Sequence, residues 1–156
     1  LHKEYRRQRQ MCIRDRLKLR VGVLEQHNIV RHGLFKHLSG QSVLCLSEFF
    51  NFADMLEALE QNQLDVLMIG HLMDSDPVHL VRNLITRYPN LKILVLLNRP
   101  DPVIASQLQA VGAHGVMAKT QSLPDYADAL RSLARGERYA MLSDGRASME
   151  KPLYDA

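Results

Sequence analysis

Few residues of this chain have the type and spacing that catalytic chemistry needs. It contains no Gly-x-Ser-x-Gly elbow, phosphate-binding loop or dinucleotide fingerprint, the motifs of common enzymes built from alternating strands and helices. The histidines show no metal-ligand spacing with the cysteines, and His32 and His37 do not form the i, i+4 pair of a helical zinc site. We therefore expect a protein that is not an enzyme. The remaining candidates for a functional site are acidic side chains and a lysine, Lys119, that lie next to apolar runs of the sequence.

Those acids and the lysine must be positioned by elements that alternate along the chain. Glu25 follows one apolar run and Lys119 follows another, and stripes at helical spacing separate the runs. The runs predict strands at 19–24, 43–47, 66–69, 92–97 and 115–118. The stripes predict helices at 27–38, 52–59, 77–88, 102–111 and 123–134.

This alternation predicts an α/β fold. The strands are nearly continuous apolar runs, as expected when helices cover both faces of a sheet. Strands that alternate with helices at this spacing form a parallel sheet with right-handed crossovers. We expect a doubly wound, five-stranded parallel sheet of flavodoxin-like order 2-1-3-4-5, with its functional crevice beyond the carboxyl ends of the central strands.

Four stretches of the sequence resemble landmarks of one family, the receiver domains of NarL/FixJ-type response regulators. They are residues 23–34, 87–96, 110–119 and 134–139. The first resembles the family's opening strand, acidic turn and first helix, and the last resembles the end of its fifth helix. The resemblance implies a receiver domain of a two-component, phosphorelay regulator.

The resemblance also implies that the phosphorylation site is degenerate. A receiver holds Mg²⁺ with an acidic pair and with an aspartate that accepts the phosphoryl group. The acidic-pair positions here are Glu25 and Gln26, and the acceptor position is Gly70. Because magnesium is usually anchored by carboxylates, we expect Mg²⁺ binding to be lost and no cofactor to take its place.

The switch positions that the resemblance implies have changed as well. The hydroxyl position after the fourth strand is Leu97, and the aromatic position on the fifth strand is Val116. The crevice lysine, Lys119, is retained. We expect Lys119 to pair with Glu25 across the crevice, in place of the lost ion cluster.

Other groups are weaker candidates for a phosphoryl acceptor. Asp74 and Asp76 precede Pro77 and are typical of turn and N-cap residues. Asp65 enters the third strand at the opposite edge of the sheet, and we interpret His71 as a loop histidine.

Composition and charge divide the chain into three parts. Residues 1–16 hold six of the 20 Lys and Arg residues but only two of the 17 acids, so the basic character of the chain is confined to this head and the remaining residues have a net charge of −1. Such an arm can bind nucleic acid. Met11–Asp15 resembles a translated sequencing-transposon adaptor, however, and we favour a non-native or disordered head. Residues 17–136 form the receiver-like domain, and 137–156 are expected to form a linker or tail.

The cysteine and hydropathy patterns bear on location. Cys12 and Cys45 indicate no disulfide framework, and Cys45 is expected to be a buried free thiol, which favours a reducing cytoplasm. No apolar run reaches the roughly 20 residues of a membrane helix.

The leading hypothesis is a pseudo-receiver that regulates transcription through phosphorylation-independent dimerisation or partner binding. It predicts a homodimer or a heterodimer with another response regulator, with Asp125, Asp128 and Arg131 as candidate interface residues. DNA would be bound only through a helix-turn-helix domain absent from these 156 residues. The alternative is a stand-alone adaptor that binds a kinase or another regulator. An active receiver with an unorthodox acceptor is the third possibility.

Overall fold

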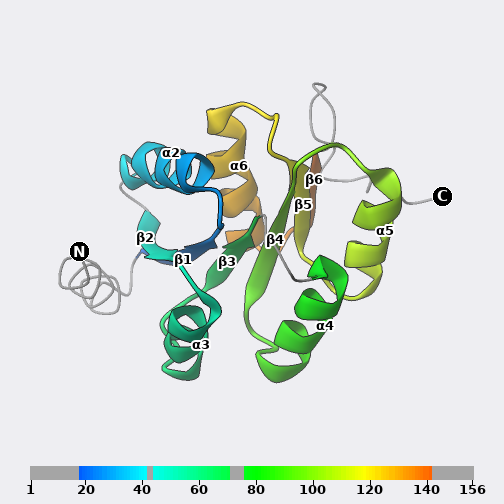
Figure 1. Ribbon diagram of the computed structural model, residues 1–156, viewed down its shortest axis with the longest axis horizontal. Coiled ribbons are helices and arrows are strands. Elements are labelled where there is room, and N and C mark those ends of the chain that lie inside the picture. The colour runs from blue at the N-terminus through cyan, green and yellow to red at the C-terminus, as the bar shows by residue number, and fades with distance from the viewer. Residues whose placement is uncertain (1–17, 42–43, 71–75, 142–156) are drawn as a thin grey trace.

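The computed structural model describes residues 18–41, 44–70 and 76–141. Within these residues, helices and strands alternate along the chain (Figure 1). They are β1 (Leu19–Leu24), α2 (Asn28–Ser39), β2 (Leu44–Phe49), α3 (Phe52–Glu60), β3 (Val66–Ile69), α4 (Pro77–Arg87), β4 (Lys92–Leu97), α5 (Pro102–Ala110), β5 (Gly115–Ala118), α6 (Leu123–Ala134) and β6 (Tyr139–Met141). The predicted alternation is confirmed, whereas the predicted head lies outside the described residues.

The sheet has one strand more than expected. Its order is β2-β1-β3-β4-β5-β6, and every neighbouring pair is parallel. The order 2-1-3-4-5 is therefore confirmed for the first five strands, but the prediction that the sheet ends there is wrong. β6 lies in the segment predicted to be a linker. Tyr139 N donates to His114 O at 3.1 Å, and the Tyr139 side chain is buried in the core, so pairing and burial extend the domain at least to this strand.

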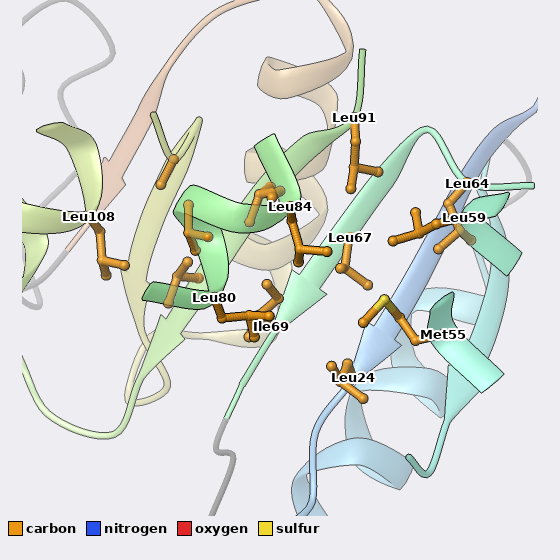
Figure 2. Packing of buried hydrophobic residues seen from close by; sticks show 14 of the residues in the cluster. Leu24, Met55, Leu59, Leu64, Leu67, Ile69, Leu80, Leu84, Leu91 and Leu108 are labelled. Carbon is orange, nitrogen blue, oxygen red and sulfur yellow. The ribbon is translucent and has the colours of Figure 1, made fainter. Parts of the chain in front are cut away.

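Two hydrophobic cores lie on opposite faces of the sheet. The helices α3, α4 and α5 cover one face, and α2 and α6 cover the other (Figure 1). Along β3, Leu67 and Ile69 belong to the first core, whereas Val66 and Met68 belong to the second. Figure 2 shows the first core, where side chains from α3 and α4 meet those of β1 and β3. Because successive strand residues point to opposite faces, continuous apolar runs supply both cores.

Short polar and glycine signals set the helix ends. The N-cap residues Asn51 and Asp76 accept from Asp54 N at 2.9 Å and from Val78 N at 3.0 Å, respectively. Gly112 and Gly136 follow α5 and α6 with φ values of 110° and 81°, a left-handed conformation that favours glycine. These ends agree with the predictions from sequence.

One cysteine departs from expectation. Cys45, in β2, is half-buried and disulfide-bonded, so the prediction of a buried free thiol is wrong. Cys45 therefore does not support the expectation of a reducing cytoplasm, which was based on a free thiol at this position. Among the described residues, no helix is long and apolar enough to cross a membrane.

His114 directly precedes β5 and contacts the start of β4. Its Nδ1 accepts a hydrogen bond from Ile93 N at 3.1 Å, which requires an unprotonated nitrogen. Burial, followed by the charges of Lys92 and Arg138, lowers the pKa of His114 to about 4. This histidine is therefore a structural hydrogen-bond acceptor.

The lowered pKa of His114 predicts a specific acid sensitivity. The unfolded chain binds this proton at a higher pH than the folded chain, so stability is lost as the pH falls from about 6.5 towards 4. Because His114 is only partly buried, we expect a loss of about 1 to 2 kcal/mol after allowing for solvent screening. Urea unfolding of the wild type and of His114→Gln at several pH values checks this. A stability difference between the two proteins that does not change with pH would contradict it.

Candidate functional site

The crevice at the carboxyl edge of the sheet is formed by residues that directly follow the central strands. Leu24 of β1 is level with Ile69 of β3, so the residues after them, Glu25 and Gly70, are neighbours. Gly70 N donates to Leu24 O at 2.9 Å. On the other side, Lys119 N donates to Leu97 O at 2.7 Å, which fixes Lys119 at the end of β5.

A buried ion pair spans this crevice. The Lys119 ammonium contacts Oε1 of Glu25, as the sequence predicted. The exposed side-chain fractions are 0% for Glu25 and 10% for Lys119, so both charges are withdrawn from water. Oε2 of Glu25 accepts from His27 N at 2.7 Å. Among the described residues, Lys119 Nζ contacts no other hydrogen-bonding partner, so Glu25 is its counter-charge.

Gly70 provides the space that the Glu25 carboxylate occupies. A Cβ atom added at Gly70 would lie 2.8 Å from Cδ of Glu25 and closer still to Oε1. Contacts under about 3 Å force one group to move. The crevice thus holds a Glu25 carboxylate where a side chain at position 70 would begin. The observed position of the Glu25 side chain therefore requires glycine at position 70.

The remaining predicted crevice residues contribute no hydroxyl group. Leu97 and Val116 are buried in the core under α3, α4 and α5. Gln26 is exposed, one residue beyond the buried Glu25. The described residues contain no cluster of three or more histidine, cysteine or acidic side chains that could hold a metal ion. His71 and Asp74 lie outside the described residues, whereas Asp65 accepts from Arg20 at the opposite edge.

A tyrosine on α6 holds the backbone of the crevice lysine. The Tyr126 hydroxyl donates to Lys119 O at 3.0 Å, and the ring is buried. Burial, followed by the nearby charges of Glu25 and Asp125, raises the pKa of Tyr126 to about 12. The phenol is therefore a permanent donor at neutral pH. The contact connects the crevice directly to α6.

A second buried ion pair, which the sequence analysis missed, supports the crevice from α2. Arg31 donates to Glu48 Oε1 at 3.0 Å, to Glu25 O at 2.8 Å and to Asn28 Oδ1 at 2.7 Å. Its guanidinium lies 4.4 Å from the ring centroid of Phe50. Arg31 thus fixes the backbone of Glu25 while neutralising the buried Glu48.

A sequence signal for this pair exists. Arg31 shares a helix face with Leu34 and Leu38, and Glu48 shares a strand face with Leu46. Opposite charges on two faces that must pack together indicate a buried pair, because an unpaired charge there would be strongly unfavourable.

Replacing Arg31 with lysine is expected to destabilise the protein by about 1 to 2 kcal/mol, since lysine keeps the charge but cannot reproduce the fork of hydrogen bonds or the stacking on Phe50. Urea unfolding measures the change. Lys36→Arg is an exposed control on the same helix. Wild-type stability in Arg31→Lys would show that the charge alone matters.

The three candidate interface residues on α6 differ in solvent exposure and in the contacts they make within the chain. Asp125 is half-buried and caps its own helix by accepting from Ser122 N at 3.2 Å and from Ser122 Oγ at 2.8 Å. Asp128 and Arg131 are exposed and pair at 3.0 Å, and Arg131 also donates to Gln41 at 2.8 Å. Asp128 and Arg131 therefore remain on the surface, whereas Asp125 has a structural role.

Comparisons with known proteins give response regulators. No family model matches the chain. Transcriptional regulatory protein DegU of Brevibacillus brevis is 26% identical over 129 residues, which cover 78% of this chain and 52% of DegU. Response regulator protein VraR of Staphylococcus aureus is 26% identical over 123 residues, covering 78% of this chain and 59% of VraR. The chain thus spans a little over half the length of these curated relatives.

Solved structures of the stress response regulator RcsB have the same fold. The non-phosphorylated receiver domain from Escherichia coli is 22% identical with a TM-score of 0.72, covering 81% of this chain and 99% of that one. RcsB of Salmonella enterica serovar Typhimurium bound to promoter rprA is 24% identical with a TM-score of 0.68, covering 76% and 61%. The chain therefore has the fold of a receiver domain, and its sequence relatives are response regulators.

Proposed function

We propose that this chain is the receiver domain of a transcription regulator and that it acts without phosphorylation. The buried Glu25–Lys119 pair beside Gly70 carries this proposal. Similarity to DegU, and to RcsB, which has been solved on promoter DNA, supports a role in transcription. Contact with DNA would come from a separate helix-turn-helix domain.

The crevice is unsuited to the chemistry of phosphoryl transfer. Gly70 has no side chain to accept a phosphoryl group. Mg²⁺ is anchored by carboxylates, and Glu25 is already engaged by Lys119 and by His27 N. Leu97 and Val116 offer neither the hydroxyl nor the aromatic ring of a switch. We propose that the chain binds no Mg²⁺, carries no cofactor and catalyses no reaction.

The Glu25–Lys119 pair would instead hold the crevice in one permanent state. A covalent switch changes a charge that biases a two-state element, and no such change is available at Gly70. Regulation would then depend on association. We propose a cytoplasmic homodimer, or a heterodimer with another response regulator, formed through the outer face of α6 at Asp128 and Arg131. Alternatively, the same face of α6 would bind a different partner protein, such as a kinase or another regulator.

Sedimentation velocity with and without Mg²⁺ and a small phosphodonor tests this proposal. We expect the same distribution of oligomers under both conditions. Arg131→Glu is expected to weaken dimerisation by about tenfold or more, as expected when like charges meet across an interface. Arg82→Glu, an exposed change on α4, is the matched control. An oligomeric state that changes when the phosphodonor is added would contradict the proposal.

A further inference from the structure

Two cavities lie between α3 and α4, on the sheet face opposite α2 and α6. One has a volume of about 430 Å³ and the other about 320 Å³, and Arg87 and Tyr88 line both. No crevice residue lines either cavity. Volumes of this size are typical of small-molecule sites. The cavities therefore offer a second place for recognition, independent of Glu25 and Lys119.

The larger cavity has an apolar floor. Phe52 and Leu56 are one helical turn apart on α3, and Leu80 and Leu84 are one turn apart on α4. Figure 2 shows Leu80 and Leu84 on α4 and Met55 and Leu59 on the neighbouring α3. Leu56 is 36% exposed. The floor therefore presents apolar surface that a ligand can cover.

A carboxylate of the smaller cavity, Glu60, contacts the two residues that line both cavities. Glu60 accepts from the Tyr88 hydroxyl at 2.5 Å and from the Arg87 guanidinium. The Tyr88 hydroxyl, followed by Arg87, lowers the pKa of Glu60, as expected where two donors face a carboxylate. The Glu60 side chain is 51% exposed and leaves this position at little cost. The Arg87–Tyr88 pair is thus a carboxylate-binding arrangement filled by a replaceable side chain.

We infer that these two cavities, which share Arg87 and Tyr88 and are together called the α3–α4 groove, bind a small amphipathic monocarboxylic acid. Its carboxylate takes the place of Glu60 on Arg87 and Tyr88, and its apolar part lies on Leu56, Leu80 and Leu84. Guanidinium and phenol donors recognise a carboxylate by charge-assisted hydrogen bonds. The inference goes beyond the proposed function and does not depend on it, because Glu25, Gly70 and Lys119 line neither cavity.

The test is an NMR shift titration of the ¹⁵N-labelled chain with octanoate. We expect saturable shifts for residues of α3 and α4, with a Kd on the order of 1 mM. Octylammonium and 1-octanol are controls with the same apolar part. Equal binding of all three, or no saturable shift at about 10 mM octanoate, would overturn the inference.

Two substitutions should change affinity in opposite directions. Arg87→Met removes the charged donor and is expected to weaken octanoate binding by about tenfold or more. Glu60→Gln removes the competing carboxylate and is expected to strengthen it by about two- to threefold. Arg82→Met, which lines neither cavity, is the matched control. Weaker binding to Glu60→Gln would overturn the inference even if Arg87→Met failed to fold.

Discussion

Replacing Gly70 with aspartate is expected to destabilise the protein by about 3 kcal/mol. The new Cβ would lie 2.8 Å from Cδ of Glu25, and the new carboxylate would face a buried carboxylate of the same charge. Restoring the acceptor residue alone therefore does not restore a receiver site. Urea unfolding measures the loss of stability. Incubation with Mg²⁺ and a phosphodonor is expected to leave this variant unmodified.

Two further variants separate the causes. Gly70→Ala introduces the steric contact without the charge and is expected to cost about half as much. Adding Glu25→Ala to Gly70→Asp removes both the clash with the carboxylate and the repulsion. We expect the double variant to be more stable than the sum of the single changes predicts, with a coupling of about 1 to 3 kcal/mol. Strictly additive effects would show that Glu25 does not occupy the space beside Gly70.

Replacing Lys119 with alanine is expected to destabilise the protein by about 3 to 5 kcal/mol. The change leaves the fully buried Glu25 carboxylate without its counter-charge, since His27 N alone does not neutralise it. Urea unfolding measures this, and an unchanged m-value would show that the fold itself is kept.

An exposed ion pair provides the control for Lys119. Arg135 pairs with Glu137 at 2.8 Å with both side chains in solvent, so Arg135→Ala is expected to cost at most about 1 kcal/mol. Lys119→Met combined with Glu25→Gln removes both buried charges and should recover most of the loss. If Lys119→Ala were no more destabilising than Arg135→Ala, the pair would have no role in holding the crevice.

Much of the fold could be predicted because the sequence patterns are local. Apolar runs of strand length alternate with helical stripes, and caps such as Asn51 and Asp76 mark where helices begin. The pairing of Glu25 with Lys119 was predictable for a similar reason. Both directly follow strands of one parallel sheet, which places them at the same edge.

The missed features depend on contacts between distant parts of the chain. β6 is only three residues long and is defined by its pairing with β5 and by the burial of Tyr139. The Arg31–Glu48 pair joins a face of α2 to a face of β2. No local sequence pattern specifies which residues of the two elements lie opposite each other. The close approach of Gly70 to Glu25 likewise follows from the β1–β3 register. The sequence shows that position 70 lacks a side chain, but it does not show that the Glu25 carboxylate occupies the vacant space.

Intact-mass measurement after incubation with Mg²⁺ and acetyl phosphate shows whether this chain can be phosphorylated. A receiver that retains its acceptor aspartate serves as the positive control, and gains the mass of one phosphoryl group. We expect no mass change for this chain, because Gly70 offers no acceptor and Glu25 is engaged by Lys119. A phosphoryl adduct on this chain, lost on treatment with acid or alkali, would show that it is a phosphorylated receiver after all.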